Sequence, residues 1–159
     1  MKKSPIYAGR LERFLAYLLD ALLIVIPVRL SVTMFLQVDP AGQSTVDPVF
    51  FPVMFLINLA YYAYFTASRW QATPGKRLLG IYVIRTDNQR LTALDATERF
   101  LAFTLPYLPL YVSFLSPAWG KTLTMFLVIY WFAPILYTQE RVGIHDRLCR
   151  TRVLIGRVG

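Results

Sequence analysis

Apolar residues along the chain gather into four long blocks separated by polar segments. Each block consists mostly of Leu, Ile, Val, Phe, Tyr, Met and Ala. A bilayer core about 30 Å thick needs roughly 20 residues of helix, with about 17–25 observed. The pattern therefore predicts four transmembrane helices, over residues 14–36, 49–67, 100–119 and 122–138. A soluble all-helical core is the alternative interpretation of the same blocks.

Composition agrees with a membrane protein of one domain, residues 1–159. Hydrophobic residues make up 56% of the chain, whereas soluble domains lie nearer about 45–50%. The basic start and first apolar run also resemble a cleaved signal peptide. That run contains Asp20, exceeds the usual length and precedes no clear small-x-small cleavage site, so we expect an uncleaved first span. The expected fold class is an all-α membrane protein.

The basic residues lie almost entirely in three polar segments. Of the 17 Lys and Arg residues behind the net charge of +8, 15 lie in segments 1–13, 68–99 and 139–159. Loop 37–48 has none and carries Asp39 and Asp47. Because Lys/Arg-rich loops stay in the cytoplasm, we expect a multi-pass protein of the cell (inner) membrane with both termini cytoplasmic. The basic segments then contact the anionic lipid of the bilayer, and nucleic acid is not needed to explain the charge.

The polar segment 68–99 contains a stretch that favours extended structure. Ile81 to Ile84 favour a strand, and Asp87-Asn88 favours a turn. We expect a short cytoplasmic hairpin or an interfacial element, and an amphipathic helix in the headgroup layer is the alternative. The preceding TPGKRLLG contains Gly-Lys but lacks the spacing of a phosphate-binding loop, which leaves a Pro-Gly turn before basic residues.

Similar short stretches recur in the same order in the two halves of the chain. ERFLAY at 12–17 resembles ERFLAF at 98–103, and MFL occurs at 54–56 and at 125–127. Arg-Leu precedes Val83-Ile84 and Val153-Leu154 at the same spacing. The order suggests two related halves, each a helix pair with a polar tail, in a parallel repeat. Chance similarity among apolar, Arg-rich segments is the alternative.

Asp20 is an acid inside the first predicted span. It lies seven residues after Arg13, so the two share a helix face about 10 Å apart along the axis. A lone charge at mid-bilayer costs about 2.5–3.5 kcal/mol on insertion scales. We therefore expect one of three arrangements: Asp20 faces the bundle interior, it is protonated, or it meets a cation, with Arg99 and Arg13 as candidates. Asn58 and tyrosines are candidates for neutral hydrogen bonds.

Two interpretations of Asp20 remain open. In the first, it is a proton or cation site whose pKa is raised by burial and lowered by a nearby arginine. In the second, Asp20 and the arginines form a polar clasp that only fixes helix packing. An acid inside the membrane favours neither on its own, although function is the default hypothesis for such a residue.

His145 and Asp146 follow the last predicted span. A chain with one histidine offers little for a metal centre, so we favour a surface cap or turn that pairs with Arg13, Arg147 or another basic residue. Cys149, the single cysteine, permits no intramolecular disulfide. The sequence contains no Ser-His-Asp set, nucleotide loop or cysteine cluster, so we expect no enzyme, no metal and no cofactor.

Three stretches together resemble the RDD family of small bacterial membrane proteins: AGRLERFLAYLLDALL, ATPGKRLLGIYVI and GIHDRLCRTRVL. That family takes its name from an arginine and two aspartates, and the resemblance implies Arg13, Asp20 and Asp146 for them. It covers nearly the whole chain. The family commonly has a glycine in the turn of its second element, where this chain has Asp-Asn-Gln at 87–89.

For function, the resemblance implies transport of unidentified ligands, and some family members look like sodium/proton exchangers. We therefore expect a transporter or cation/proton exchanger with a site of Arg13, Asp20 and Asp146, supported by Arg99, Asn58 and His145. Four spans are few for a carrier, so we also expect a homo-oligomer. The alternative is a non-transporting membrane scaffold for a protein partner, in which these residues only fix helix packing.

Overall fold

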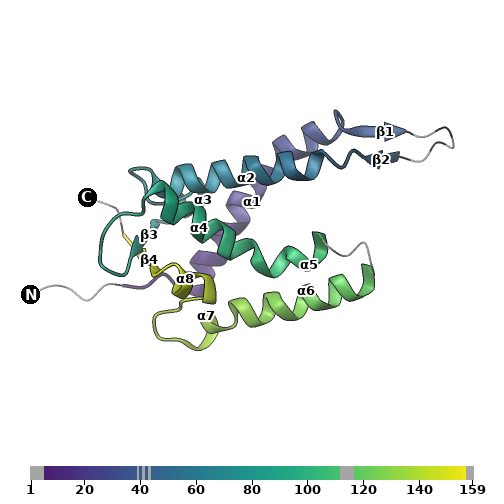
Figure 1. Ribbon diagram of the computed structural model, residues 1–159. Coiled ribbons are helices and arrows are strands. Elements are labelled where there is room, and N and C mark those ends of the chain that lie inside the picture. Colours follow the sequence, from purple (N-terminus) through teal and green to yellow (C-terminus); the bar gives the residue numbers. More distant parts are fainter. Residues whose placement is uncertain (1–5, 39, 41, 43, 112–116, 157–159) are drawn as a thin grey trace, which may run out of the picture.

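Long helices extend in one direction from a small cap. The computed structural model describes residues 6–38, 40, 42, 44–111 and 117–156. The cap consists of α3 (Pro74–Leu78), β3 (Ile81–Arg85), α8 (Ile144–Leu148) and β4 (Thr151–Ile155) (Figure 1). The fold is therefore mostly helical, but it is not purely α, because it also contains short strands.

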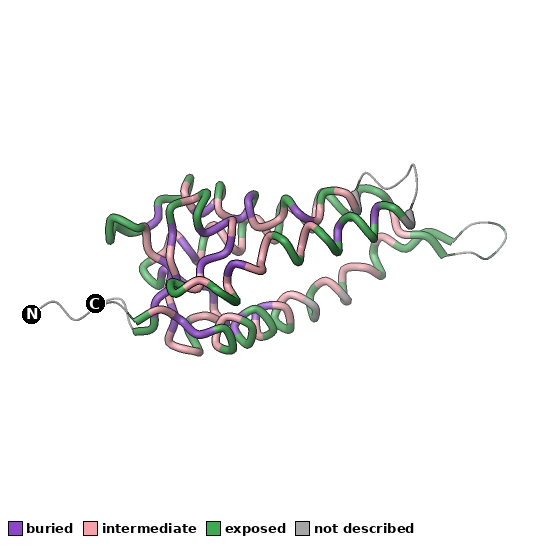
Figure 2. The backbone as a smooth tube through the Cα atoms, turned by 90° about the horizontal axis from the view of Figure 1, so that it is seen from below, coloured by how far each residue is buried: buried purple, intermediate pink, exposed green. Residues whose placement is uncertain are grey.

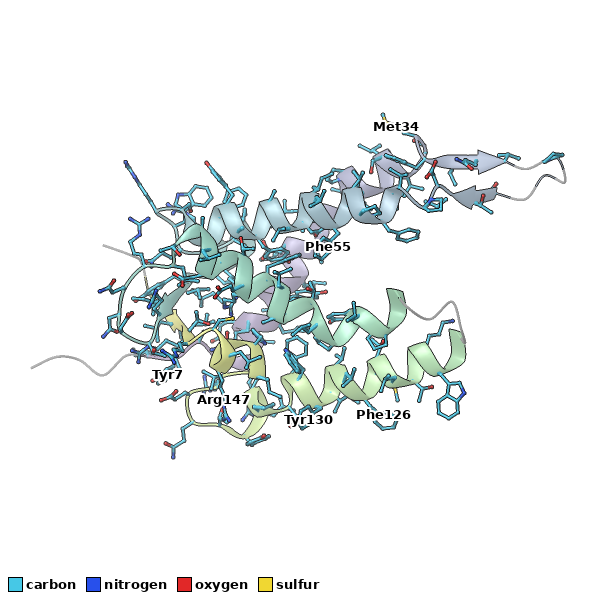
Figure 3. The ribbon with its side chains drawn as sticks, viewed as in Figure 1. Tyr7, Met34, Phe55, Phe126, Tyr130 and Arg147 are labelled. Carbon is cyan, nitrogen blue, oxygen red and sulfur yellow. The ribbon has the colours of Figure 1, made fainter. Side chains whose placement is uncertain are left out.

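Three helical stretches in the described chain are long and apolar enough to cross a membrane. They are α1 (Arg10–Val32), α2 (Phe50–Ala67) and the stretch Trp119–Tyr137, which joins most of α6 (Pro117–Phe132) to α7 (Pro134–Tyr137). In their most apolar windows, only 12%, 6% and 17% of residues are buried. Figure 2 shows exposed and half-buried residues alternating along these helices, and Phe126 and Tyr130 of α6 point outward in Figure 3. Apolar side chains exposed all round a helix are typical of contact with lipid.

The predicted span over 100–119 is not confirmed as one continuous helix. α4 (Ala93–Thr104) is followed by the 3₁₀ turn η1 (Leu105–Tyr107) and α5 (Leu108–Tyr111), and residues 112–116 lie outside the described chain. Pro106 and Pro109 interrupt the helix because proline has no N–H to donate. α4 also begins earlier than predicted. Thr92 caps it by accepting a bond from the Asp95 N–H at 3.1 Å, while the Asp95 carboxylate accepts from the Thr92 N–H at 2.8 Å.

At the end farthest from the cap, the loop between α1 and α2 forms a small antiparallel sheet. β1 (Leu36–Val38) pairs with β2 (Ser44–Val46), with Leu36 opposite Val46. No element was predicted there, and α1 ends at Val32, short of the predicted boundary at residue 36. The hairpin projects away from the rest of the molecule in Figure 1.

The strand prediction for 81–84 is correct, but its partner is distant in sequence. β3 pairs with β4 in an antiparallel sheet, so the predicted local hairpin is not confirmed. The chain turns after β3, where the Asn88 N–H donates to the Arg85 carbonyl at 3.0 Å. A small apolar core lies at this sheet, and Figure 2 shows buried segments concentrated at the cap. Its members are Ala8, Ala16, Ile81, Val83, Leu91 and Val153.

The cap repeats its own geometry. We call the sequence separation between Val83 and Val153 the repeat offset. The same separation relates the first and last residues of α3 to those of α8, and the first and last residues of β3 to those of β4. Gln71 and Arg141, which the same offset relates, both have positive φ, of 48° and 53°. In the sheet, Val83 lies opposite Val153, its own counterpart. An approximate two-fold axis therefore passes between these two residues. This symmetry supports the hypothesis of two related halves.

Candidate functional site

Asp146 is the centre of a buried ion cluster where the cap meets the long helices. Its side chain is fully buried, and its two oxygens face different helices. The Arg13 Nη1 atom of α1 lies 3.0 Å from Oδ2, and the Arg99 Nη2 atom of α4 lies 2.5 Å from Oδ1. Arg13 and Arg99 occupy equivalent positions in the ERFLA repeat. One carboxylate thus receives an arginine from each half.

The local fold of α8 directs Asp146 toward these arginines. Gly143 precedes the helix, and its N–H donates to Asp146 Oδ2 at 3.3 Å. A side chain at Gly143 would meet the His145 ring at 2.8 Å, so only glycine leaves room for the imidazole. His145 Nε2 lies 3.3 Å from Asp146 Oδ1, and its ring packs edge-on against Phe103. The turn thereby fixes both side chains of the His-Asp pair.

The charges of this cluster follow from burial and from the arginines. Burial by itself would raise the pKa of Asp146, but His145, Arg99 and Arg13 outweigh it and hold that pKa well below its usual range. Burial lowers the pKa of His145 to about 4, and the nearby Arg99 acts in the same direction. At neutral pH, Asp146 is therefore ionised and His145 is neutral.

Asp20 lies in a separate environment that contains neutral donors. It is 1% exposed. The Tyr61 hydroxyl of α2 donates to Oδ1 at 3.0 Å, the Thr73 hydroxyl to Oδ2 at 2.5 Å, and the Gly75 N–H to Oδ1 at 2.8 Å. Within the described residues, no arginine or lysine forms an ion pair with Asp20. These bonds join the middle of α1 to α2 and to the start of α3.

Gly75 allows α3 to approach α1 closely enough for these bonds. A Cβ atom at this position would lie 2.4 Å from the Ala16 carbonyl oxygen and 2.9 Å from Asp20 Cγ. Real Cβ atoms do not approach other atoms so closely, and Ala16, itself 0% exposed, leaves no alternative space. The glycine of the TPGK stretch is therefore required by the contact between the cap and α1.

Lys76 follows Gly75 and lies among the charged residues of both sites. Burial lowers its pKa to about 7, Arg99 acts in the same direction, and Asp20 and Asp146 oppose them. The repeat offset takes Lys76 to Asp146. The two halves therefore place side chains of opposite charge at equivalent positions, and Lys76 changes charge near neutral pH.

A cavity of about 250 Å³ lies between α1 and α2 and reaches Tyr61. Most of its lining is apolar, with Ser31 and Asn58 as polar members. Asn58 donates to the Met54 carbonyl at 2.8 Å. Tyr61 thus lines the cavity and also donates its hydroxyl to Asp20. Within the described residues, no group of three or more His, Cys, Asp or Glu could hold a metal ion.

The structure brings together four of the six predicted site residues, but in a different pairing. Arg13, Arg99, His145 and Asp146 form one cluster. The prediction that Arg13 or Arg99 meets Asp20 is wrong, because both arginines bind Asp146 instead. Seven residues of α1 separate Arg13 from Asp20 by about 10 Å, which is too far for one shared contact. Asn58 does not bond to Asp20 but to its own helix.

Sequence analysis missed Thr73, Gly75 and Lys76. A buried carboxylate needs several donors, and the three supplied here come from segments 41, 53 and 55 residues away. The available signal was the internal repeat, since the TPGKRL stretch occupies the position of the GIHDRL stretch in the other half. The predicted role of Asp146 beside a basic residue agrees with the observed contacts, although the pair is buried and not a surface cap.

Comparison with known proteins identifies the family. The family model described as "RDD family" matches residues 7–150. A relative from Bacillus subtilis (strain 168), described as "Uncharacterized protein YxaI", is 27% identical over 164 residues, which cover 92% of this chain and 96% of the relative. No solved structure matches the chain significantly. The chain belongs to the RDD family, and this membership together with its apolar helices supports a membrane location.

Proposed function

We propose that this RDD family protein exchanges a cation for protons across the membrane and that Asp20 binds them in turn. The observation that carries the proposal is the contrast between the two buried aspartates. Asp146 is neutralised directly by two arginines, whereas the hydrogen bonds to Asp20 come from a phenol, a hydroxyl and a backbone N–H. Within the described residues no arginine forms an ion pair with Asp20, so none has to be displaced when a proton or a cation binds.

Two neighbouring features support this role for Asp20. Tyr61 lines the cavity between α1 and α2, and its hydroxyl donates to Asp20, so this residue links the cavity to the acid. On the other side, Lys76 carries a charge that depends on pH near neutrality. When Lys76 loses its proton, its attraction for the Asp20 carboxylate weakens, and the carboxylate is then available to an external cation.

The contacts of the N-terminal segment support an even number of membrane crossings. Ala8 N–H donates to the Val153 carbonyl at 3.0 Å, and Ile155 N–H donates to the Ile6 carbonyl at 2.9 Å. Segments that pair in this way lie on the same side of the membrane. With α1, α2 and Trp119–Tyr137 as three crossings, α4 to α5 would supply the fourth. The excess of Lys and Arg at the cap favours the cytoplasm for that side.

Exchange through so small a bundle would use a homo-oligomer to enclose the pathway. The exposed apolar faces of α1, α2 and α6 offer surface for such an assembly.

A non-transporting scaffold is the second candidate. It is favoured by the fact that the bonds to Asp20 join α1 to α2 and α3, while those to Asp146 join α1 to α4 and α8. In that case both aspartates are clasps that hold the cap on the helices, and the function belongs to a protein partner.

The decisive variant is Asp20→Asn in the full chain reconstituted in liposomes. Asparagine preserves the shape of the side chain. Its oxygen can accept from Gly75 N–H and Tyr61, and its amide can donate to the Thr73 hydroxyl, which is free to rotate. The variant therefore removes ionisation and keeps the clasp. Sodium, potassium and lithium gradients are imposed, and internal pH is followed with an enclosed dye.

The matched control is Asp87→Asn, which removes an exposed acid from the turn after β3. Exchange predicts cation-driven pH change in wild type and in Asp87→Asn, and its loss in a folded Asp20→Asn. If folded and inserted wild type gives no change of internal pH with any of the three cations, cation/proton exchange is ruled out and the scaffold is favoured. Equal flux in wild type and Asp20→Asn removes Asp20 as the ion site.

A further inference from the structure

A second cavity, of about 300 Å³, opens at the cap and shares no lining residue with the cavity at Tyr61. Its polar walls include the side chains of Arg69, Trp70, Arg77 and Tyr82. Gly80 and Gly156 also line it, and none of the described residues along its walls is acidic. A cavity of this size with two guanidinium groups and no carboxylate is suited to an anion.

The two arginines differ from the paired arginines of the cap. Within the described residues, Arg13, Arg85 and Arg99 form ion pairs with aspartates, whereas Arg69 and Arg77 form none. Both side chains are exposed. Their positive charge is therefore available to a ligand.

Aromatic stacking fixes the position of Arg77. Its guanidinium carbon lies 4.2 Å from the centroid of the Trp70 ring. Trp70 in turn stacks on Phe65 of α2, with 5.5 Å between ring centroids and 23° between planes. The stack extends from the end of the apolar helix to the cavity, so the guanidinium is held in place without a carboxylate.

The cavity lies where α2 leaves its apolar environment. α2 ends at Ala67, and Arg69 follows two residues later. Tyr61, Tyr62, Tyr64, Phe65 and Trp70 form an aromatic cluster along this end of the helix. Tyrosine and tryptophan gather at the level of lipid headgroups. With α2 across the membrane, the two arginines would therefore lie at headgroup depth.

The other half of the repeat lacks this arrangement. The repeat offset takes Arg69 and Trp70 to Gln139 and Glu140. Only Arg77 has a basic counterpart, Arg147, which is exposed and does not line the cavity. Figure 3 shows Arg147 at the cap, close to α8 and α7. Arg147 therefore serves as a matched control, because it is an exposed basic residue of the cap that lies outside the cavity.

We propose that this cavity binds the phosphate of an anionic phospholipid headgroup, with Arg69 and Arg77 as its ligands. A guanidinium offers paired donors that match the oxygens of a phosphate. Inorganic phosphate has the same chemistry, but it would gain nothing from a site at headgroup depth. The proposal depends on α2 crossing the membrane and not on ion exchange.

The test uses the full chain in a neutral detergent, with bound lipid counted by native mass spectrometry. Phosphatidylglycerol is titrated in parallel with phosphatidylcholine, and inorganic phosphate is added as a competitor. Each basic residue near a membrane surface contributes about fivefold to the binding of anionic lipid. We expect one tightly held phosphatidylglycerol in wild type and roughly 25-fold weaker binding in Arg69→Gln/Arg77→Gln.

The single variant Arg147→Gln should bind phosphatidylglycerol as wild type does. If the double variant does not fold, Arg69→Gln alone serves, because Arg69 has no ion pair in the described chain, and it should weaken binding about fivefold. If Arg147→Gln weakened the binding of phosphatidylglycerol as much, the lipid would be held by the general positive charge of the cap, and the proposed site would be overturned. Retention of phosphatidylcholine as strong as that of phosphatidylglycerol, or displacement of the lipid by millimolar phosphate, would overturn the headgroup assignment.

Discussion

The contact between Gly75 and α1 predicts that Gly75→Ala strongly destabilises the protein. The added methyl would lie 2.4 Å from the Ala16 carbonyl oxygen and 2.9 Å from the Asp20 carboxylate. Neither neighbour can move freely, because Ala16 is 0% exposed and lies on the long helix α1, and Asp20 is 1% exposed. α3 must therefore move away from α1, and the bond from Gly75 N–H to Asp20 lengthens from 2.8 Å.

The magnitude follows from three contributions. Overpacking of a dense site costs about 1–3 kcal/mol. Leaving a buried acceptor without its hydrogen bond costs about 1–3 kcal/mol. Alanine in a helix recovers about 1 kcal/mol relative to glycine. The net loss is about 1–5 kcal/mol, which for a chain of this size corresponds to a fall in Tm of roughly 2–20 °C.

Thermal unfolding of the full chain in detergent measures this effect. Gly80→Asn is the matched control, because Gly80 lies two residues after α3 with φ of +64°, and no atom lies within 4 Å of the position that a Cβ would take. Asparagine tolerates this backbone conformation, so we expect a change within about 1 kcal/mol. A Gly75→Ala protein as stable as Gly80→Asn would refute the close approach of α3 to α1.

Three further predictions concern the charged residues of the cap. Asp146→Asn leaves Arg13 and Arg99 without their carboxylate and should cost about 3–5 kcal/mol in chemical unfolding, whereas the exposed Asp87→Asn should cost less than about 1 kcal/mol; equal effects would contradict the cluster. His145 has a folded pKa of about 4, below about 6.5 in the unfolded chain, so the unfolded state binds the proton first. The contribution of neutral His145 to the free energy of unfolding is fully present above about pH 6.5 and falls by about 3 kcal/mol as the pH falls toward 4. His145→Phe should lack this pH dependence of stability, and an unchanged dependence would refute the assignment. Lys76, with a pKa of about 7, should react with an amine-specific reagent with a midpoint near pH 7, measured by peptide mass spectrometry, and a midpoint near about 10.4 would show that it is an ordinary lysine.

The long apolar helices were the most predictable part of the fold. Their composition alone distinguishes α1, α2 and the stretch up to Tyr137 from the cap, since lipid-facing helices need apolar residues on every side. Their ends were less predictable. α1 ends at Val32, and the chain then turns through residues 33–35 into β1, a change that hydropathy cannot separate from a continuing helix. Pro106 gave a visible signal for the break after α4, and the predicted span ran through it.

The cap shows what local pattern cannot supply. Ile81 to Ile84 are recognisable as a strand, but pairing with Thr151–Ile155 depends on tertiary structure. The spacing of Arg13 and Asp20 placed them on one face, yet it could not say that the arginine binds an aspartate 133 residues away. The donors to Asp20 were hidden for the same reason. The internal repeat was the best long-range signal in the sequence, because it places Lys76 and Asp146 at equivalent positions.

The central claim is that Asp20 gives up a proton when a cation binds, and infrared difference spectroscopy of the full chain in lipid tests it directly. A cation is added at constant pH, and the C=O band of a protonated carboxylic acid is followed. We expect this band to decrease in wild type and in Asp87→Asn, and to show no change in Asp20→Asn. A decrease that persists in folded Asp20→Asn, or no decrease in wild type with sodium, potassium or lithium, would contradict the account and leave Asp20 as a clasp between α1, α2 and α3.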